Sequence, residues 1–132
     1  MELNEELIRS VVEGVMAKMA QTETSFEKKK DQSGIIHIKT STVKCEPFEQ
    51  EGVYLKDLLT LEEAPRMGAG IMELDHTSFE WTLTYDEYDM VIDGILQIEI
   101  DGRVLTGNPG DILYIPKGSH IHFQTPTKAR YA

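Results

Sequence analysis

The first apolar positions of the chain repeat with the period of an α-helix. Between residues 3 and 19 they follow one another at steps of one, three or four residues, which places them on one stripe: Leu3, Leu7, Ile8, Val11, Val12, Val15, Met16 and Met19. The pattern stops after Ala20, and residues 21–34 are polar, contain three consecutive lysines and end in Ser-Gly. We therefore predict an amphipathic helix over residues 1–20 and a polar linker over residues 21–34.

From residue 35 the apolar positions alternate, as they do in β-strands. Residues 35–40 form the first predicted strand, whereas residues 43–66 are mixed and carry leucines at spacings compatible with a short helical turn. Further strand-like segments then follow one another closely: 69–76, 79–85, 88–92, 95–100, 103–106, 111–115 and 119–124. Turn sequences such as Asp93-Gly94 separate them. Short strands about every eight residues, with no helical run between them, predict an all-β sandwich or barrel over residues 35–132.

Composition fits one ordinary globular domain. The chain has 132 residues, of which 27% are charged, and no apolar run approaches the roughly 18 residues that a membrane span requires. Cys45 is the single cysteine, so no internal disulfide can form, and the acidic N-terminus is unlike a secretory signal. We therefore expect a protein of the bacterial cytoplasm that has no membrane partner.

The charge balance is strongly acidic, with 13 basic against 23 acidic residues and a formal net charge of −10. Residues 70–126 hold ten of the acidic residues and only two basic ones, Arg103 and Lys117. Because such a surface repels phosphate backbones, nucleic acid is excluded as a partner. A phosphorylated ligand would require divalent cations to mediate its binding.

Two short blocks in the strand-rich region carry a family resemblance. The first block is EYDMVIDG, residues 87–94, and the second is GDILYIPKG, residues 110–118. Both resemble signature blocks of the cupin superfamily. The resemblance implies a cupin jelly-roll barrel, preceded here by the N-terminal amphipathic helix.

The metal-binding part of this resemblance is incomplete. In typical cupins two histidines, a glutamate and a later histidine bind one divalent metal inside the barrel. Only Glu87 matches these positions, and the other three hold Trp81, Leu83 and Ile121. One carboxylate is too few for a stable transition-metal site. We therefore expect no metal ligands and no tightly bound transition metal.

The strands resemble one cupin subgroup more closely. WTLTYDEYDMV, residues 81–91, and IPKGS, residues 115–119, resemble the ethanolamine utilisation family EutQ. Residues 7–19 resemble the short helices that dock enzymes on the inner face of bacterial microcompartment shells. The resemblance implies a role in ethanolamine catabolism in a microcompartment, with shell proteins bound through residues 3–19. It also implies acetate kinase activity (ATP and acetate to acetyl phosphate and ADP, or the reverse), for which Mg²⁺ and ATP would be needed.

The residues themselves give a kinase only limited support. The chain lacks the Gly-x-x-x-x-Gly-Lys-Ser/Thr loop of P-loop kinases. Phosphoryl transfer depends on charge neutralisation and positioning, for which the candidates are Mg²⁺ held by Glu87 with Asp86 or Asp89, and a base from Lys117 or Arg103. The alternative function is non-catalytic: a degenerate cupin that serves as a binding or assembly module for the shell.

Alternation along residues 79–85 places Trp81 and Tyr85 on one strand face, with Glu87 following in phase. If this face lines the barrel, the two aromatic side chains wall a pocket. Glu87 is then the catalytic residue, with a pKa raised by desolvation, and Tyr114 positions groups by hydrogen bonding. In the opposing interpretation these residues are core, and a neighbouring hydroxyl such as that of Tyr114 satisfies Glu87.

His120 and His122 form a His-x-His pair, a spacing that can bind a metal. They are out of phase with the inward position, which Ile121 occupies, and this favours histidines that face solvent or an interface. Two alternatives stay open: His122 as a further binding residue of the pocket, and a metal enzyme that uses both histidines with Glu87. Because small cupins often pair through strand edges, we also expect a homodimer.

Overall fold

A computed structural model describes residues 26–132. The predicted helix over residues 1–20 and the first part of the predicted linker lie outside the described residues. The chain divides into two compact units between Lys44 and Cys45. Among the described residues, no helix is long and apolar enough to cross a membrane.

The described part of the first unit is a two-stranded hairpin. β1 (Lys28–Lys30) pairs antiparallel with β2 (Ile36–Ile38), and a short 3-10 helix, η1 (Thr40–Thr42), follows. The backbone N–H of Ser33 donates a 2.9 Å hydrogen bond to Asp31 Oδ2 and fixes the turn. The lysine run was predicted to lie in a linker, and this is wrong because the Asp31 turn brings the lysines alongside β2.

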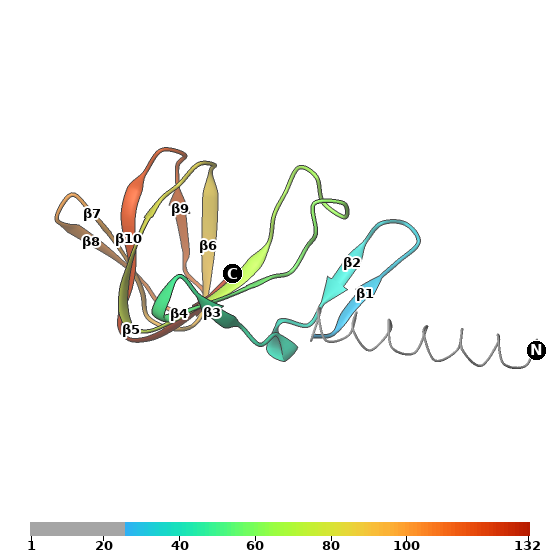
Figure 1. Cartoon of the computed structure of the whole chain (residues 1–132), viewed down its shortest axis with the longest axis horizontal. Helices are drawn as coiled ribbons and strands as arrows, with labels where there is room; N and C mark the ends of the chain where they lie inside the picture. Colours follow the sequence, from blue (N-terminus) through green and yellow to red (C-terminus); the bar gives the residue numbers. More distant parts are fainter. Residues whose placement is uncertain (1–25) are drawn as a thin grey trace, which may run out of the picture. The chain divides into compact units, whose positions relative to one another are not determined.

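The second unit is antiparallel β-structure. Its strands are β3 (Glu46–Phe48), β4 (Gln50–Asp57), β5 (Gly70–Thr82), β6 (Glu87–Gly94), β7 (Leu96–Ile100), β8 (Arg103–Gly107), β9 (Ile112–Ile115) and β10 (His120–Tyr131). They are hydrogen-bonded in the order β3-β4-β5-β10-β6-β9, and β7 pairs with both β10 and β8. Because β10 pairs with β7 through its first half and with β6 through its last residues, the sheet folds over a central core (Figure 1).

Three elements differ from the sequence prediction. Residues 43–66 contain β3 and β4 in place of the predicted helical turn, because β4 finds its hydrogen-bond partner in the distant β5. The predicted strands 69–76 and 79–85 merge into β5. β10 continues past the predicted end at residue 124, since a bulge between Thr125 and Lys128 restores its pairing with β5.

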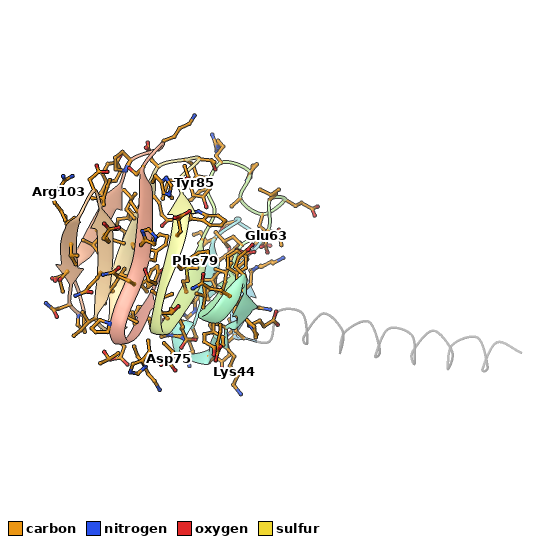
Figure 2. All side chains as sticks on the ribbon, turned by 60° about the vertical axis from the view of Figure 1, so that its left-hand side comes forward. Lys44, Glu63, Asp75, Phe79, Tyr85 and Arg103 are labelled. Atoms are coloured by element: carbon orange, nitrogen blue, oxygen red, sulfur yellow. The ribbon has the colours of Figure 1, made fainter. Side chains whose placement is uncertain are left out.

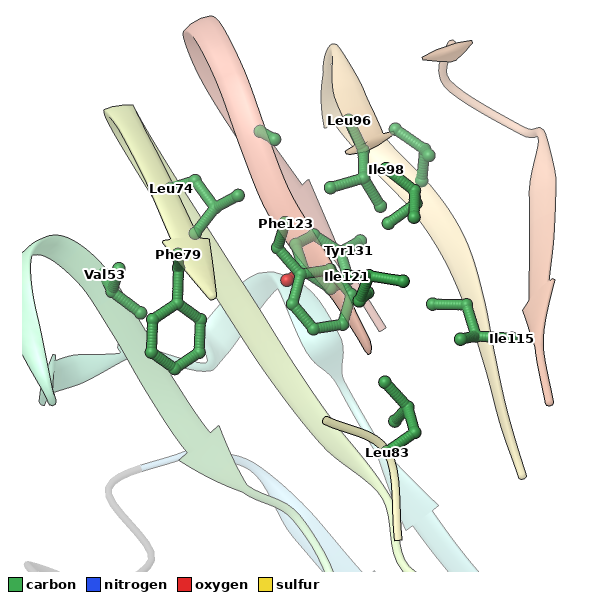
Figure 3. Packing of buried hydrophobic residues seen from close by; sticks show 12 residues of the cluster. Val53, Leu74, Phe79, Leu83, Leu96, Ile98, Ile115, Ile121, Phe123 and Tyr131 are labelled. Atoms are coloured by element: carbon green, nitrogen blue, oxygen red, sulfur yellow. The ribbon is translucent and has the colours of Figure 1, made fainter. Parts of the chain in front are cut away.

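The core lies inside the folded sheet and is built from alternate residues of facing strands (Figure 3). Leu83 and Ile121 are each 1% exposed. The rings of Phe123 and Tyr131 stack with centroids 5.7 Å apart. The buried cluster comprises Val53, Leu74, Phe79, Leu83, Val91, Leu96, Ile98, Ile115, Ile121, Phe123, Ala129 and Tyr131.

Gly94 lets β6 end directly against β10. Its φ is 76°, and a Cβ at this position would overlap the carbonyl oxygen of Lys128. The neighbouring Ile95 N–H donates a 2.9 Å hydrogen bond to the same oxygen. The predicted Asp93-Gly94 turn therefore requires glycine for both its backbone conformation and its close approach.

Candidate functional site

β6 places two acidic side chains on the inner face of the sheet. Glu87 and Asp89 lie in phase with the buried Val91, and the register of β6 with β9 sets them opposite Ile115 and Leu113. Asp89 is only 4% exposed. Glu87 is half-buried. Two carboxyl groups two residues apart on one inward face must therefore share a largely apolar environment.

The two carboxyl groups are hydrogen-bonded to each other. Burial, then the charge of Glu87 and this hydrogen bond, raise the pKa of Asp89 to about 9. Burial also raises the pKa of Glu87, whereas the hydrogen bond from Asp89 lowers it. At neutral pH the pair therefore carries one proton, held on Asp89 and donated to Glu87. Asp89 Oδ2 is buried and makes no hydrogen bond with any described residue.

The charges of this pair raise the pKa values of two tyrosines. Tyr131 is buried, and burial followed by the charges of Asp89 and Glu87 raises its pKa well above the ordinary value. Its hydroxyl donates a 2.8 Å hydrogen bond to the sulfur of Met72. Tyr85 is exposed beyond the end of β5 (Figure 2), and its pKa is raised by partial burial and then by Glu87. The charge of Glu87 therefore raises the pKa of two phenols, the buried one of Tyr131 and the exposed one of Tyr85.

Two turns close the barrel end at which β6 begins. Leu83 donates a 2.9 Å backbone hydrogen bond to Ser119 and accepts one of 2.7 Å from Gly118. The Lys117 N–H donates a 2.8 Å hydrogen bond to Asp86 Oδ1. These bonds bring the exposed Lys117 to the same end of the barrel as Glu87, which follows Asp86 directly.

Trp81 is the predicted pocket residue that lies against the core. It shares a face with Phe79 and Leu83, as the alternation predicted. Its ring stacks on that of Phe79 with centroids 5.3 Å apart, and Phe48 contacts it edge-on at 6.1 Å. The side chain is partly buried, so it forms a wall between the core and the outside.

Tyr114 lies on the opposite face from Glu87. It is 64% exposed, is set opposite Tyr88 across β6 and β9, and hydrogen-bonds to Asp86. Strand alternation turns it outward, because its neighbour Ile115 occupies the inward position. The predicted contact between Tyr114 and Glu87 is therefore replaced by the hydrogen bond between Glu87 and Asp89.

His122 also lies on an outer face, together with His120. The intervening Ile121 points inward and is 1% exposed. The structure therefore separates His122 from the interior pair and removes the alternative of a metal site made by both histidines with Glu87.

Sequence reasoning missed Tyr131, although the inward alternation of β10 resumes after the bulge at Ala129 and could have indicated it.

The family model described as "Ethanolamine utilisation protein EutQ" matches residues 1–132. The chain belongs to the EutQ family. A relative from Clostridioides difficile (strain 630), named acetate kinase EutQ, is 46% identical over 136 residues, which cover 98% of this chain and 86% of the relative. A relative of the same name from Salmonella typhimurium (strain LT2) is 36% identical, and the chain spans 60% of its length.

Solved structures agree with the fold. The structure of the C. difficile EutQ protein matches with a TM-score of 0.78 and 49% identity over 81% of this chain and 90% of that one. A Cupin_2 domain of an XRE family transcriptional regulator from Enterobacter cloacae matches with a TM-score of 0.54, over 61% of this chain and 92% of that one. At 18% identity this second likeness concerns the fold alone. The predicted all-β cupin fold of this EutQ family member is confirmed.

The metal site of typical cupins does not fit the interior of this EutQ family member. Two of its ligand positions hold Leu83 and Ile121, which are buried in the core and have no ligand atoms. The third holds Trp81, whose ring stacks on Phe79. Glu87 remains, but it accepts a hydrogen bond from the protonated Asp89, and a lone hydrogen-bonded carboxylate is a poor site for a transition metal.

Proposed function

We propose that this EutQ family member is an acetate kinase of ethanolamine catabolism. The observation that carries the proposal is the 46% identity to the C. difficile protein named acetate kinase EutQ, over 98% of this chain and 86% of that protein. The interior pair of Glu87 and Asp89 supplies a candidate site for it, at a barrel end that also carries a lysine.

In this proposal a carboxylate oxygen of acetate bonds to the γ-phosphorus of ATP. The bond from that phosphorus to the bridging oxygen breaks, and ADP leaves with the electron pair. Because the interior carries two carboxyl groups, the nucleotide enters as its magnesium complex, with the ion as part of the substrate. Glu87 faces this complex, Asp89 holds Glu87 in place through its proton, and Lys117 supplies positive charge at the same barrel end.

A coupled assay for acetate-dependent ADP formation tests the proposal. Glu87→Gln should lower the rate by roughly 100-fold or more, because it removes the ionised carboxylate of the pair. Glu62→Gln, the same change on an exposed loop, is the matched control. The reverse reaction, ATP formation from acetyl phosphate and ADP, provides an independent readout. Equal background rates in the wild type and Glu87→Gln would remove the kinase proposal.

A non-catalytic assembly module is the second candidate, and an exposed apolar patch favours it. On the outer face of β6 and β9, Tyr88 lies opposite Tyr114 and Met90 opposite Ile112. Their exposed fractions run from 38% to 64%. A patch of this kind is typical of protein–protein interfaces. It supports a homodimer, while residues 3–19, outside the described residues, remain the proposed segment for binding a microcompartment shell.

A further inference from the structure

Two histidines and two glutamates lie together on the outer face of the second unit. The strand registers set Glu80, His122 and Glu99 side by side across β5, β10 and β7. His120 lies two residues before His122, so both imidazoles project from the same face of β10. The buried Ile121 between them points the other way, into the core. This cluster is therefore separated from the interior pair by the sheet itself.

Glu80 lies between the two imidazoles. Its Oε1 is 3.6 Å from His120 Nε2, and its Oε2 is 3.5 Å from His122 Nε2. Both separations are long for charge-assisted hydrogen bonds, which are usually near 2.8 Å. Two ligand atoms that each lie about 2.1 Å from a tetrahedral zinc ion are roughly 3.4 Å apart. Each imidazole nitrogen is therefore separated from its own oxygen of Glu80 by nearly the distance between two zinc ligands.

Glu99 orients His122 through the ring nitrogen that does not face Glu80. The Nδ1 of His122 is 3.0 Å from Glu99 Oε2. Because an ionised carboxylate only accepts hydrogen bonds, this contact requires the proton on Nδ1, and in the neutral imidazole Nε2 is then the nitrogen that can bind an ion. A carboxylate that accepts from the second nitrogen of a histidine ligand is the usual support of zinc-binding histidines.

We propose that Glu80, His120 and His122 bind a divalent transition ion, zinc in particular, and that Glu99 is a positioning residue for this site. As they stand in the structure, no three such side chains among the described residues lie close enough together to hold an ion. The side chains of His120 and Glu80 are 61% and 65% exposed, so small rotations can bring them onto the ion. The proposal is independent of kinase activity.

The site leaves a coordination position for an outer ligand. Three protein ligands leave the fourth position of a tetrahedral ion to water or a bound molecule. The next row of the same sheet face consists of Ser78, Gln124 and Gln97, which line an open hollow of about 460 Å³. A small polar molecule bound to the ion would therefore meet amide and hydroxyl groups.

Calorimetric titration of zinc chloride into the tag-free, full-length protein tests the proposal. We expect one ion per chain, and His120→Asn and Glu80→Gln should each weaken binding by more than about tenfold. Glu99→Gln should weaken it by about tenfold, since it removes the orienting hydrogen bond. Cobalt(II) gives a second readout, because a site of low coordination number has intense visible absorption that His120→Asn should abolish.

The two remaining histidines of the chain, His37 and His76, are matched controls. His37→Asn and His76→Asn should leave zinc affinity unchanged, and circular dichroism of each metal-free variant verifies its fold. Three results would each overturn the assignment. They are an absence of zinc binding to the wild type, equal affinity in His120→Asn and Glu80→Gln, and loss of binding in His76→Asn.

Discussion

Asp89→Asn should remove a pH-dependent loss of stability from this EutQ family member. The pKa of Asp89 is raised in the folded protein by burial and by Glu87, whereas in the unfolded chain it returns to an ordinary value near 3.9. Between these two pKa values the folded protein keeps a proton that the unfolded chain releases. The free energy of unfolding therefore falls as the pH rises through this window. Asparagine keeps the size of the side chain and a hydrogen-bond donor for Glu87, but it cannot titrate.

The expected magnitude follows from one retained proton. Its loss from the unfolded chain lowers the free energy of unfolding by about 1.4 kcal/mol for each pH unit. Both pH 5.5 and pH 7.5 lie below the folded-state pKa of about 9. Between them the wild type should lose about 3 kcal/mol more than Asp89→Asn. Groups that titrate alike in both proteins cancel in this difference.

Urea unfolding at several pH values measures the difference directly. Trp81 is the single tryptophan, so its fluorescence reports on the second unit. Asp93→Asn, the same substitution at an exposed position of β6, should keep the slope of the wild type. If the wild type and Asp89→Asn gave parallel profiles, the conclusion that folded Asp89 holds a proton would be refuted.

Two further substitutions test the fold and the outer surface. Gly94→Ala should lower the free energy of unfolding by more than about 2 kcal/mol, because the positive φ and the Lys128 carbonyl both oppose a Cβ. Gly102→Ala, also at positive φ but with nothing within 4 Å, should cost less, and equal urea midpoints would contradict the packing argument. If the protein forms the proposed homodimer through the patch on β6 and β9, the double variant Tyr88→Ser/Tyr114→Ser should be monomeric in sedimentation velocity. A monomeric wild type would refute the proposed homodimer, and a dimeric double variant would exclude this patch as its interface.

The strands from residue 87 onward were predictable because each one is short, alternates and ends at a turn sequence. Local pattern failed where pairing is distant. β4 is formed because it lies against β5, and the three lysines of β1 are extended because they pair with β2. Residues 43–66 contain few local signals for these pairings, so their leucines gave a misleading helical spacing.

The site was predictable only as far as motif and alternation reach. The motif indicated Glu87 and left Asp86 and Asp89 as alternatives beside it, whereas the register with β9 decides that Glu87 and Asp89 lie in the interior. Tyr114 illustrates the reverse case. It is one residue from the inward Ile115, and only the pairing of β9 with β6 fixes which of the two faces Glu87. Tyr131 is distant in sequence from every motif and approaches the pair through the core.

The same alternation creates two chemically different carboxylate environments in one thin sheet. Inside, burial and the charge of Glu87 raise the pKa of Asp89, so Asp89 retains its proton and Glu87 carries the charge. Outside, Glu80 and Glu99 face imidazoles, which can exchange their protons for a metal ion. The zinc titration contains no nucleotide, whereas the kinase assay measures acetate-dependent ADP formation. The failure of one proposal therefore leaves the other standing, since each depends on residues that the sheet keeps on opposite faces.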